Sequence, residues 1–191
     1  MSEPLFPQLL ERALDQHGLL TPEDAQAIGA NDAALRLMAH RGTLERVGFG
    51  IYRVPQLAGD RLAQYQDALL RVRNDAALSH ETALDLHDLC DINPAQVHVT
   101  VAPGIRLRRR LPGWLVVHRG HLDPHDLAWH EGLRIATPVR AILDGIAIHV
   151  GDRFIDQAVE TGRDRGLLGP ADLRRIEIAR AKARLAALEA L

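Results

Sequence analysis

Residues 21–55 decide the fold, and they read TPEDAQAIGANDAALRLMAHRGTLERVGFGIYRVP. The start Thr21-Pro22-Glu23-Asp24 predicts a helix, because a threonine cap, an early proline and acidic residues all suit the positive end of a helix. Gly29 ends this helix, and Asn31 or Asp32 begins another that ends near residues 41–42. Two helices joined by so short a turn, the second of them amphipathic, predict a helix-turn-helix.

The second of these helices has two faces at the helical period of about 100° per residue. Ala34, Leu37 and Met38 share one face, whereas Asp32, Arg36 and His40 share the other. We expect the apolar face to be buried. Arg36 and His40 are then the outward residues of a recognition helix, and with Asn31 at its start they form its DNA-binding set.

The segment after this helix contains two short β-type runs, residues 44–47 and 51–54, around the turn Gly48-Phe49-Gly50. A hairpin directly after a helix-turn-helix is a wing. We expect Arg46 and Arg53 to reach phosphates and Phe49, at the tip, to lie against the sugar edge of a groove.

An amphipathic helix over residues 6–14 completes the winged helix of the first domain, residues 1–58. A second interpretation stays open, because winged helices also serve as protein-docking modules. Residues 1–58 contain five arginines against seven acidic residues. This balance is a poor electrostatic match for DNA, so any DNA contact must be local and geometric.

Residues 59–191 predict a second domain, a mixed α/β domain with a small sheet, which makes the whole chain α+β. Helices are expected over residues 62–72 and from Ser79 through Leu89 and Cys90, and alternation over Val97–Val101 predicts a half-buried strand. A partner strand begins at Leu115, so residues 103–112 are expected to form a hairpin loop.

This loop holds the densest cluster of charge in the chain: Arg106, Arg108, Arg109 and Arg110. Three interpretations stay open for it. The loop could bind nucleic acid, it could dock an acidic surface of a partner protein, or it could be a solvated hairpin tip. Further on, Thr137-Pro138 opens a helix, and residues 171–191 predict a long C-terminal helix whose apolar positions could support a homodimer.

Composition limits the remaining classes of function. No apolar run approaches the about 20 residues needed to span a bilayer, and the first residues lack the pattern of a signal peptide, so we expect a cytoplasmic protein without membrane contact. The single cysteine excludes an internal disulfide and a zinc finger. The ten histidines lack the spacing of a metal site, and no phosphate-binding glycine loop or nucleophile elbow is present. We therefore predict no catalytic residues, no metal, no cofactor and no enzyme activity.

Four blocks of the sequence carry a more specific signal: residues 41–55, Leu78–His87 with its core SHETALDLH, the strand Val97–Val101, and GLRIATPVRAILD at residues 132–144. In this order they resemble the AbiEi family of type IV antitoxins and transcriptional autorepressors. The resemblance implies a winged helix that binds operator DNA, an antitoxin domain, and a nucleotidyltransferase-like toxin as partner. The alternative is a protein-interaction module that neutralises its partner by direct contact without binding DNA.

Overall fold

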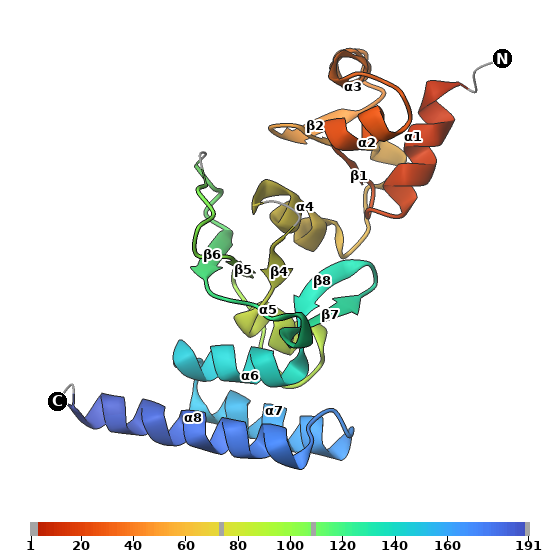
Figure 1. The fold of residues 1–191 in the computed structure, drawn as a ribbon. Helices are drawn as coiled ribbons and strands as arrows, with labels where there is room; N and C mark the ends of the chain where they lie inside the picture. The colour runs from red at the N-terminus through yellow and green to blue at the C-terminus, as the bar shows by residue number, and fades with distance from the viewer. Residues whose placement is uncertain (1–3, 73–74, 108–109, 190–191) are drawn as a thin grey trace. The chain divides into compact units, whose positions relative to one another are not determined.

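The structure is a computed structural model that describes residues 4–72, 75–107 and 110–189 (Figure 1). By its internal contacts the chain divides into two compact units, Met1–Asn74 and Asp75–Leu191. The first unit therefore holds segment 59–72 together with the winged-helix segment. Each unit is described by itself.

The first unit is a winged helix-turn-helix followed by one further helix. Its elements are α1 (Leu5–Leu14), β1 (Leu19–Leu20), α2 (Pro22–Ala27), α3 (Asp32–His40), β2 (Glu45–Gly48), β3 (Ile51–Arg53), the 3-10 turn η1 (Pro55–Leu57) and α4 (Ala63–Val72). The strands form a three-stranded antiparallel sheet in the order β1-β3-β2. The hairpin β2–β3 (residues 45–53) is called the wing below.

Local side-chain hydrogen bonds start α2 and α3 where the sequence predicts them. The backbone N–H of Thr21 donates to Asp24 Oδ2 at 2.7 Å, as part of a capping box. Asn31 caps α3, because its Oδ1 accepts the N–H of Ala34 at 3.0 Å. Residues 28–31 form the short turn between the two helices.

The core of the first unit is built from every helix of the winged helix and from the sheet. Its fully buried members are Leu9, Ala13, Leu20, Ala25, Leu35, Leu44, Tyr52 and Val54. The prediction that Leu37 is buried is wrong, because its side chain is 47% exposed. Helix α3 contacts the core through Leu35 with Met38 and Ala39. A stripe at i, i+3 and i+4 from Leu35 leaves Leu37 about 200° away, on the outer face.

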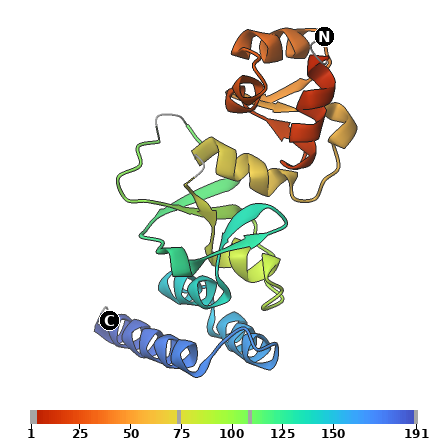
Figure 2. The ribbon, with the colours of Figure 1, turned by 45° about the vertical axis from the view of Figure 1, so that its right-hand side comes forward.

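The second unit is a five-stranded mixed sheet with helices (Figure 2). Its elements are β4 (Ala77–Leu78), α5 (His80–Leu86), β5 (Val97–Val101), β6 (Leu115–Arg119), the 3-10 turn η2 (Pro124–Asp126), β7 (Leu127–His130), β8 (Leu133–Ala136), α6 (Pro138–Ala147), α7 (Asp152–Asp164) and α8 (Pro170–Glu189). The strand order is β6-β5-β4-β8-β7. Pairs β5–β6 and β4–β8 are parallel, and the other two are antiparallel.

The parallel pairing of β5 and β6 corrects the expected hairpin. Val97 lies beside Leu115 and Val101 beside Arg119, so both strands run in the same direction. The connection between these strands is therefore a crossover that returns the chain to the edge of the sheet where β5 begins, and not a hairpin loop. Parallel strands need a connection of about a dozen residues or more, which this segment supplies.

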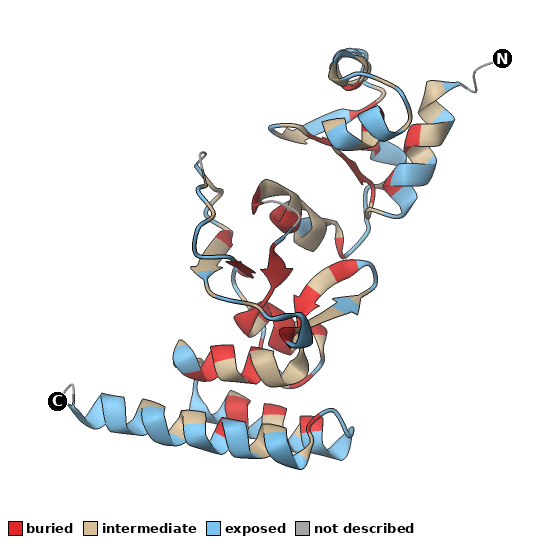
Figure 3. Cartoon of the chain, in the orientation of Figure 1, coloured by how far each residue is buried: buried red, intermediate tan, exposed pale blue. Residues whose placement is uncertain are grey.

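Strand β5 is also more buried than predicted. All five of its residues are buried, including His98 and Thr100, so both of its faces are covered (Figure 3). The strand lies between β4 and β6 and contacts α5. Alternation of polar and apolar residues indicates a half-buried strand only where the polar face meets water. Here the polar side chains meet one another instead.

The helices of the second unit pack around α6. Helix α6 contacts α5, α7 and α8. Helix α5 ends at Leu86, and Asp88 has a positive φ of 50°, so Leu89 and Cys90 follow the helix and do not lie on it as predicted. On α8, Ile176 is buried, whereas Ile178, Leu185 and Leu188 are more than half exposed. Among the described helices, none combines the length and the apolar character needed to cross a bilayer.

Candidate nucleic-acid interface

The outer face of α3 carries two polar side chains and one apolar side chain. Arg36 is exposed and forms an ion pair with Asp32, one turn earlier, at 3.2 Å. His40 is exposed at the end of the helix, and Leu37 lies exposed between these two residues. Sequence reasoning missed Leu37 as a surface residue. A guanidinium next to an apolar side chain offers a hydrogen-bond donor for guanine and a contact for a thymine methyl group.

The side chain of Asn31 caps the N-terminus of α3. Its Oδ1 binds the N–H of Ala34, so this oxygen is already used inside the protein. Its amide NH2 group remains a donor at the exposed start of α3. Asn31 can therefore contact a phosphate without giving up the cap.

The wing presents an aromatic tip and two arginines with different surroundings. Phe49 is 65% exposed at the turn. The guanidinium of Arg46 lies 5.7 Å from the centre of the Phe49 ring, and its Nε donates to the carbonyl of Gly48 at 3.3 Å. Arg53 instead pairs across the hairpin with Glu45 at 2.6 Å. Arg46 is thus the wing arginine whose charge no carboxylate in the described residues offsets at ion-pair distance.

The wing and α3 are joined by a short, ordered turn. The N–H groups of Thr43 and Leu44 both donate to the carbonyl of Met38, at 2.9 and 3.3 Å. Leu44 is buried in the core of the unit. The last turn of α3 and the residue directly before β2 are therefore held by the same contacts, which lets one rigid body present Arg36, His40 and Arg46.

The arginine loop of the second unit lies on the crossover between β5 and β6. Arg106 and Arg110 are exposed, and Arg108 and Arg109 lie outside the described residues. Arg119 at the end of β6 donates to the carbonyl of Ile105 at 2.6 Å, which attaches the loop to the sheet. Arg119 is thus a further basic residue at the base of this loop.

A cluster of three histidines lies on the second unit, and sequence reasoning missed it. His98 Nδ1 is 3.0 Å from His118 Nε2, and the rings of His80 and His118 stack with their centres 3.5 Å apart. The only signal in the sequence is the alternation of His98 and Thr100 with valines, a pattern that by itself predicts a solvent-facing polar side of the strand. Because parallel pairing puts His98 and His118 on neighbouring strands, and β4 lies on the other side of β5, residues far apart in the chain meet here.

Buried polar groups surround these histidines. Ser79 Oγ lies 2.9 Å from His80 Nδ1 and accepts the hydroxyl of Thr100 at 2.8 Å. Asp144 Oδ2 lies 3.9 Å from His80 Nδ1 and is partnered through its other oxygen by Arg140. Glu81 lies 3.7 Å from His98. Burial, followed by the nearby charges of His118 and His98, lowers the pKa of His80 to about 3.

Burial also lowers the pKa of His98 and of His118. Ser79 is fully buried, so its hydroxyl has no access to a substrate. The cluster is therefore an internal polar network in which the hydroxyls and rings are partnered with one another, whereas Asp144 Oδ2 has no hydrogen-bond partner among the described residues.

One group in the described residues has metal-ligand distances: Asp123, His125 and Asp126. The carboxylate of Asp126 is already bound by Arg140 at 3.1 Å, with Arg175 at 4.0 Å. Two guanidinium groups at the buried ligand oppose a cation, so we assign no metal to this group.

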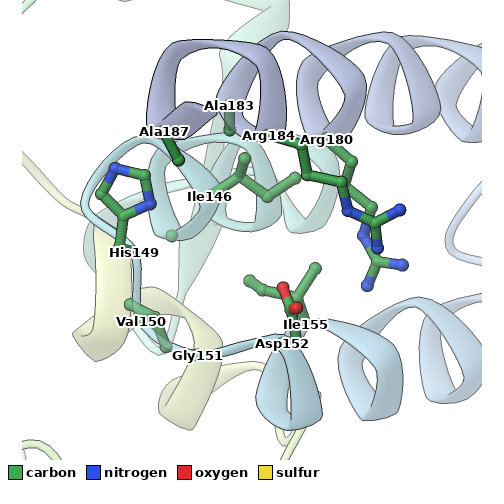
Figure 4. A pocket seen from close by; sticks show the side chains of 11 residues that line it. Ile146, His149, Val150, Gly151, Asp152, Ile155, Arg180, Ala183, Arg184 and Ala187 are labelled. Atoms are coloured by element: carbon green, nitrogen blue, oxygen red, sulfur yellow. The ribbon is translucent and has the colours of Figure 1, made fainter. Parts of the chain in front are cut away.

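A pocket of about 330 Å³ lies between the α6–α7 turn and the C-terminal half of α8 (Figure 4). Figure 4 shows Ile146 and Ile155 in its wall, with Arg180 and Arg184 at one end and His149 at the other. Its volume is at the lower limit for small-molecule sites. Arg180 is held by Asp156 at 2.6 Å, so this guanidinium joins α8 to α7.

Comparison with known proteins supports the winged helix. Residues 7–55, from within α1 to just after β3, match the family described as "Transcriptional regulator, AbiEi antitoxin". None of the proteins with curated descriptions matches the sequence. Among solved structures, the chain is similar to the RV2827C protein from Mycobacterium tuberculosis, with 15% identity, a TM-score of 0.46, and 93% of this chain and 76% of that chain covered. The similarity to the regulator family is thus confined to residues 7–55, which fold as the winged helix.

Proposed function

We propose that this protein is the antitoxin of a toxin–antitoxin pair and that it represses its own promoter by placing α3 in the major groove. The observation that carries the proposal is the match of residues 7–55 to the AbiEi regulators on a segment that folds as a winged helix. On this fold Arg36 and His40 are exposed along α3, where a recognition helix meets base edges.

The wing supplies the contacts that do not read sequence. Arg46 at the exposed hairpin is suited to a phosphate, and Phe49 to the sugar edge of the minor groove. The net charge of the chain is −2, so nonspecific affinity is low and contacts must be concentrated here. In this proposal residues 1–58 bind DNA and residues 59–191 act on the toxin, a nucleotidyltransferase-like protein, in the cytoplasm.

The test is a mobility-shift titration of the full chain against DNA from upstream of its own gene. We expect a specific complex at moderate salt that tolerates competition by an equal mass of shuffled DNA. A specific site is bound at least about a thousandfold more tightly than random DNA by proteins of this class. Equal affinity for both DNAs, with folded protein, contradicts operator recognition.

A second candidate function is favoured by one observation, the exposure of Leu37 and Phe49 on the same unit. Exposed apolar side chains are typical of protein-docking surfaces. In this alternative the winged helix binds the toxin directly. Co-purification with the product of the neighbouring gene separates the two functions: release of that partner by Leu37→Asp, in a protein that binds no operator, supports docking.

A further inference from the structure

Arg71 of α4 donates a hydrogen bond to the wing. It lies outside residues 7–55, the segment that matches the regulator family. Its Nη2 donates to the carbonyl of Val47 on β2 at 2.9 Å and to Asp67 Oδ2 at 2.9 Å. The side chain is only 22% exposed. One guanidinium nitrogen, Nη2, therefore joins the wing carbonyl to the carboxylate of Asp67, which restricts the orientation of the side chain.

The accepting carbonyl belongs to an irregular position of the wing. The pairing of β2 with β3 shifts register between Arg46 and Gly48, which leaves Val47 as the extra residue of a β-bulge. A bulged residue loses its partner in the ladder, so the carbonyl of the half-buried Val47 needs another donor. Arg71 provides that donor.

Gly48 makes the contact close. A Cβ atom at this position would lie 3.1–3.3 Å from three atoms of the Arg71 guanidinium. A residue with a Cβ atom here would require the guanidinium to shift by a few tenths of an ångström. The guanidinium of Arg71 therefore packs against Gly48 and binds the carbonyl of Val47 in one contact between α4 and the wing.

Asp67 holds Arg71 in place from within α4. The two residues are one turn apart, and the side chain of Asp67 is 15% exposed. Burial raises the pKa of Asp67, while Arg71 and, more weakly, Arg53 of the wing act in the opposite direction. Asp67 thus holds Arg71 through a direct ion pair, and it lies within the electrostatic reach of Arg53 on the wing.

We propose that Arg71 is a positioning residue for DNA binding, which holds the bulged strand of the wing so that Arg46 and Phe49 meet the DNA in a fixed orientation. This inference rests on the proposed function. It also extends the DNA-binding unit to α4, beyond the end of the family match at residue 55.

The test is a double-mutant cycle in the full chain, measured as affinity for the upstream DNA. Arg71→Ala should weaken binding about tenfold, which corresponds to about 1.4 kcal/mol. In the Arg46→Ala background the same change should cost less than about threefold, because the residue that Arg71 positions is gone. In the Arg36→Ala background, on α3, the full tenfold loss should remain. Equal losses in both backgrounds overturn the proposal.

Two further variants separate positioning from charge and from fold. Arg71→Lys keeps the charge, but its ammonium lies on a shorter side chain than Nη2 and reaches Val47 and Asp67 less well, so affinity should stay lowered. Full recovery means that the guanidinium itself is not required. Gly48→Ala shifts the guanidinium by a few tenths of an ångström without changing α4, so it should lower affinity in the same direction but by less than Arg71→Ala does. Gln64→Ala, an exposed change on α4, is the matched control and should bind as the unchanged protein does.

Amide hydrogen exchange of the free protein tests, without DNA, whether Arg71 holds the wing. In Arg71→Ala and Gly48→Ala the amides of residues 46–51 should exchange faster, while those of α1 and α2 remain as protected as before. Faster exchange in a protein that binds no DNA refutes the proposed function but supports the contact by which Arg71 holds the wing. Unchanged exchange in the wing shows that Arg71 does not hold the wing in place.

Discussion

Arg53 on β3 donates to Glu45 on β2 twice, from Nε at 3.1 Å and from Nη2 at 2.6 Å, to the same carboxylate oxygen. The pair spans the wing and is partly exposed, so it adds at most about 1 kcal/mol to stability. Its larger effect is to offset the charge of Arg53 before any DNA arrives. The two wing arginines therefore differ as phosphate ligands.

Glu45→Gln should release Arg53 and increase affinity for all DNA sequences. The salt dependence of binding should become steeper by up to about one unit in log–log slope, because one more phosphate is neutralised. The measurement is affinity for random and upstream DNA between low and moderate salt. A gain restricted to the upstream DNA contradicts this reasoning.

Removal of the arginines gives the complementary expectation. Arg46→Ala and Arg53→Ala should weaken binding to all sequences and flatten the salt slope by about one unit for a full phosphate contact. Because Glu45 already offsets Arg53, the flattening should be smaller for Arg53→Ala than for Arg46→Ala. Equal flattening indicates that the Glu45 pair opens fully on the DNA.

Arg36→Ala should weaken binding to the upstream DNA by about 1–3 kcal/mol, because an outward arginine in the middle of a recognition helix is suited to a guanine edge. Its ion pair with Asp32 is exposed and easily exchanged for a base contact. Competition against DNA with single-base changes measures the effect. An equal loss on random DNA means that Arg36 contacts only phosphate.

The caps of α2 and α3 could be predicted from sequence because they depend on neighbours. Thr21 and Asp24 are three residues apart, and Asn31 bonds the N–H of Ala34. The face of α3 was predicted less well. Its buried stripe is set by the packing of the whole first unit, and that packing places Leu35 inward and Leu37 outward.

The second unit shows the limit more clearly. Nothing local to Val97 or Leu115 states whether their strands run together or in opposition, and the parallel pairing follows from the whole sheet. The histidine cluster depends on that pairing, because it joins residues of α5, β5 and β6. A pattern along one strand therefore could not reveal it.

The histidine cluster predicts that the second unit loses stability in acid. Folding lowers the pKa of His80 from 6.5 to about 3, mainly by burial. The unfolded chain then binds more protons than the folded one below pH 6.5, so stability is full above this pH and falls as the pH drops toward 3. For this one group the loss between pH 7 and pH 5 is about 2 kcal/mol.

Denaturant unfolding at pH 7 and pH 5 measures this loss. His80→Gln should reduce the difference between the two pH values, even if it lowers stability at both. His125→Gln, a change at a histidine whose side chain is 69% exposed, is the control and should leave the difference unaltered. An unreduced difference in the His80 variant assigns the acid sensitivity to other groups.

Leu35 and Leu37 should respond in opposite ways to substitution. Leu35→Ala should lower the free energy of unfolding by about 2–5 kcal/mol, because it opens a cavity in the core of the first unit. Leu37→Ala, on the exposed face, should change stability by less than about 0.5 kcal/mol but lower the affinity for the upstream DNA. Chemical unfolding and DNA affinity, measured on the same preparations, test both. Loss of stability from Leu37→Ala alone contradicts the exposed position.

The arginine loop gives the sharpest test of the second domain. Reversal of Arg106, Arg108, Arg109 and Arg110 to glutamate should abolish protection against the toxin, because reversed charge opposes an acidic surface or a phosphate backbone. Thermal stability should change little, since the described arginines of the loop, Arg106 and Arg110, are exposed. The matched control is Arg119→Ala, which removes the attachment to Ile105 but keeps the charge of the loop itself. Full rescue of toxin-expressing cells by the reversed protein removes the loop from the mechanism, and a parallel loss of operator binding places it in the DNA interface.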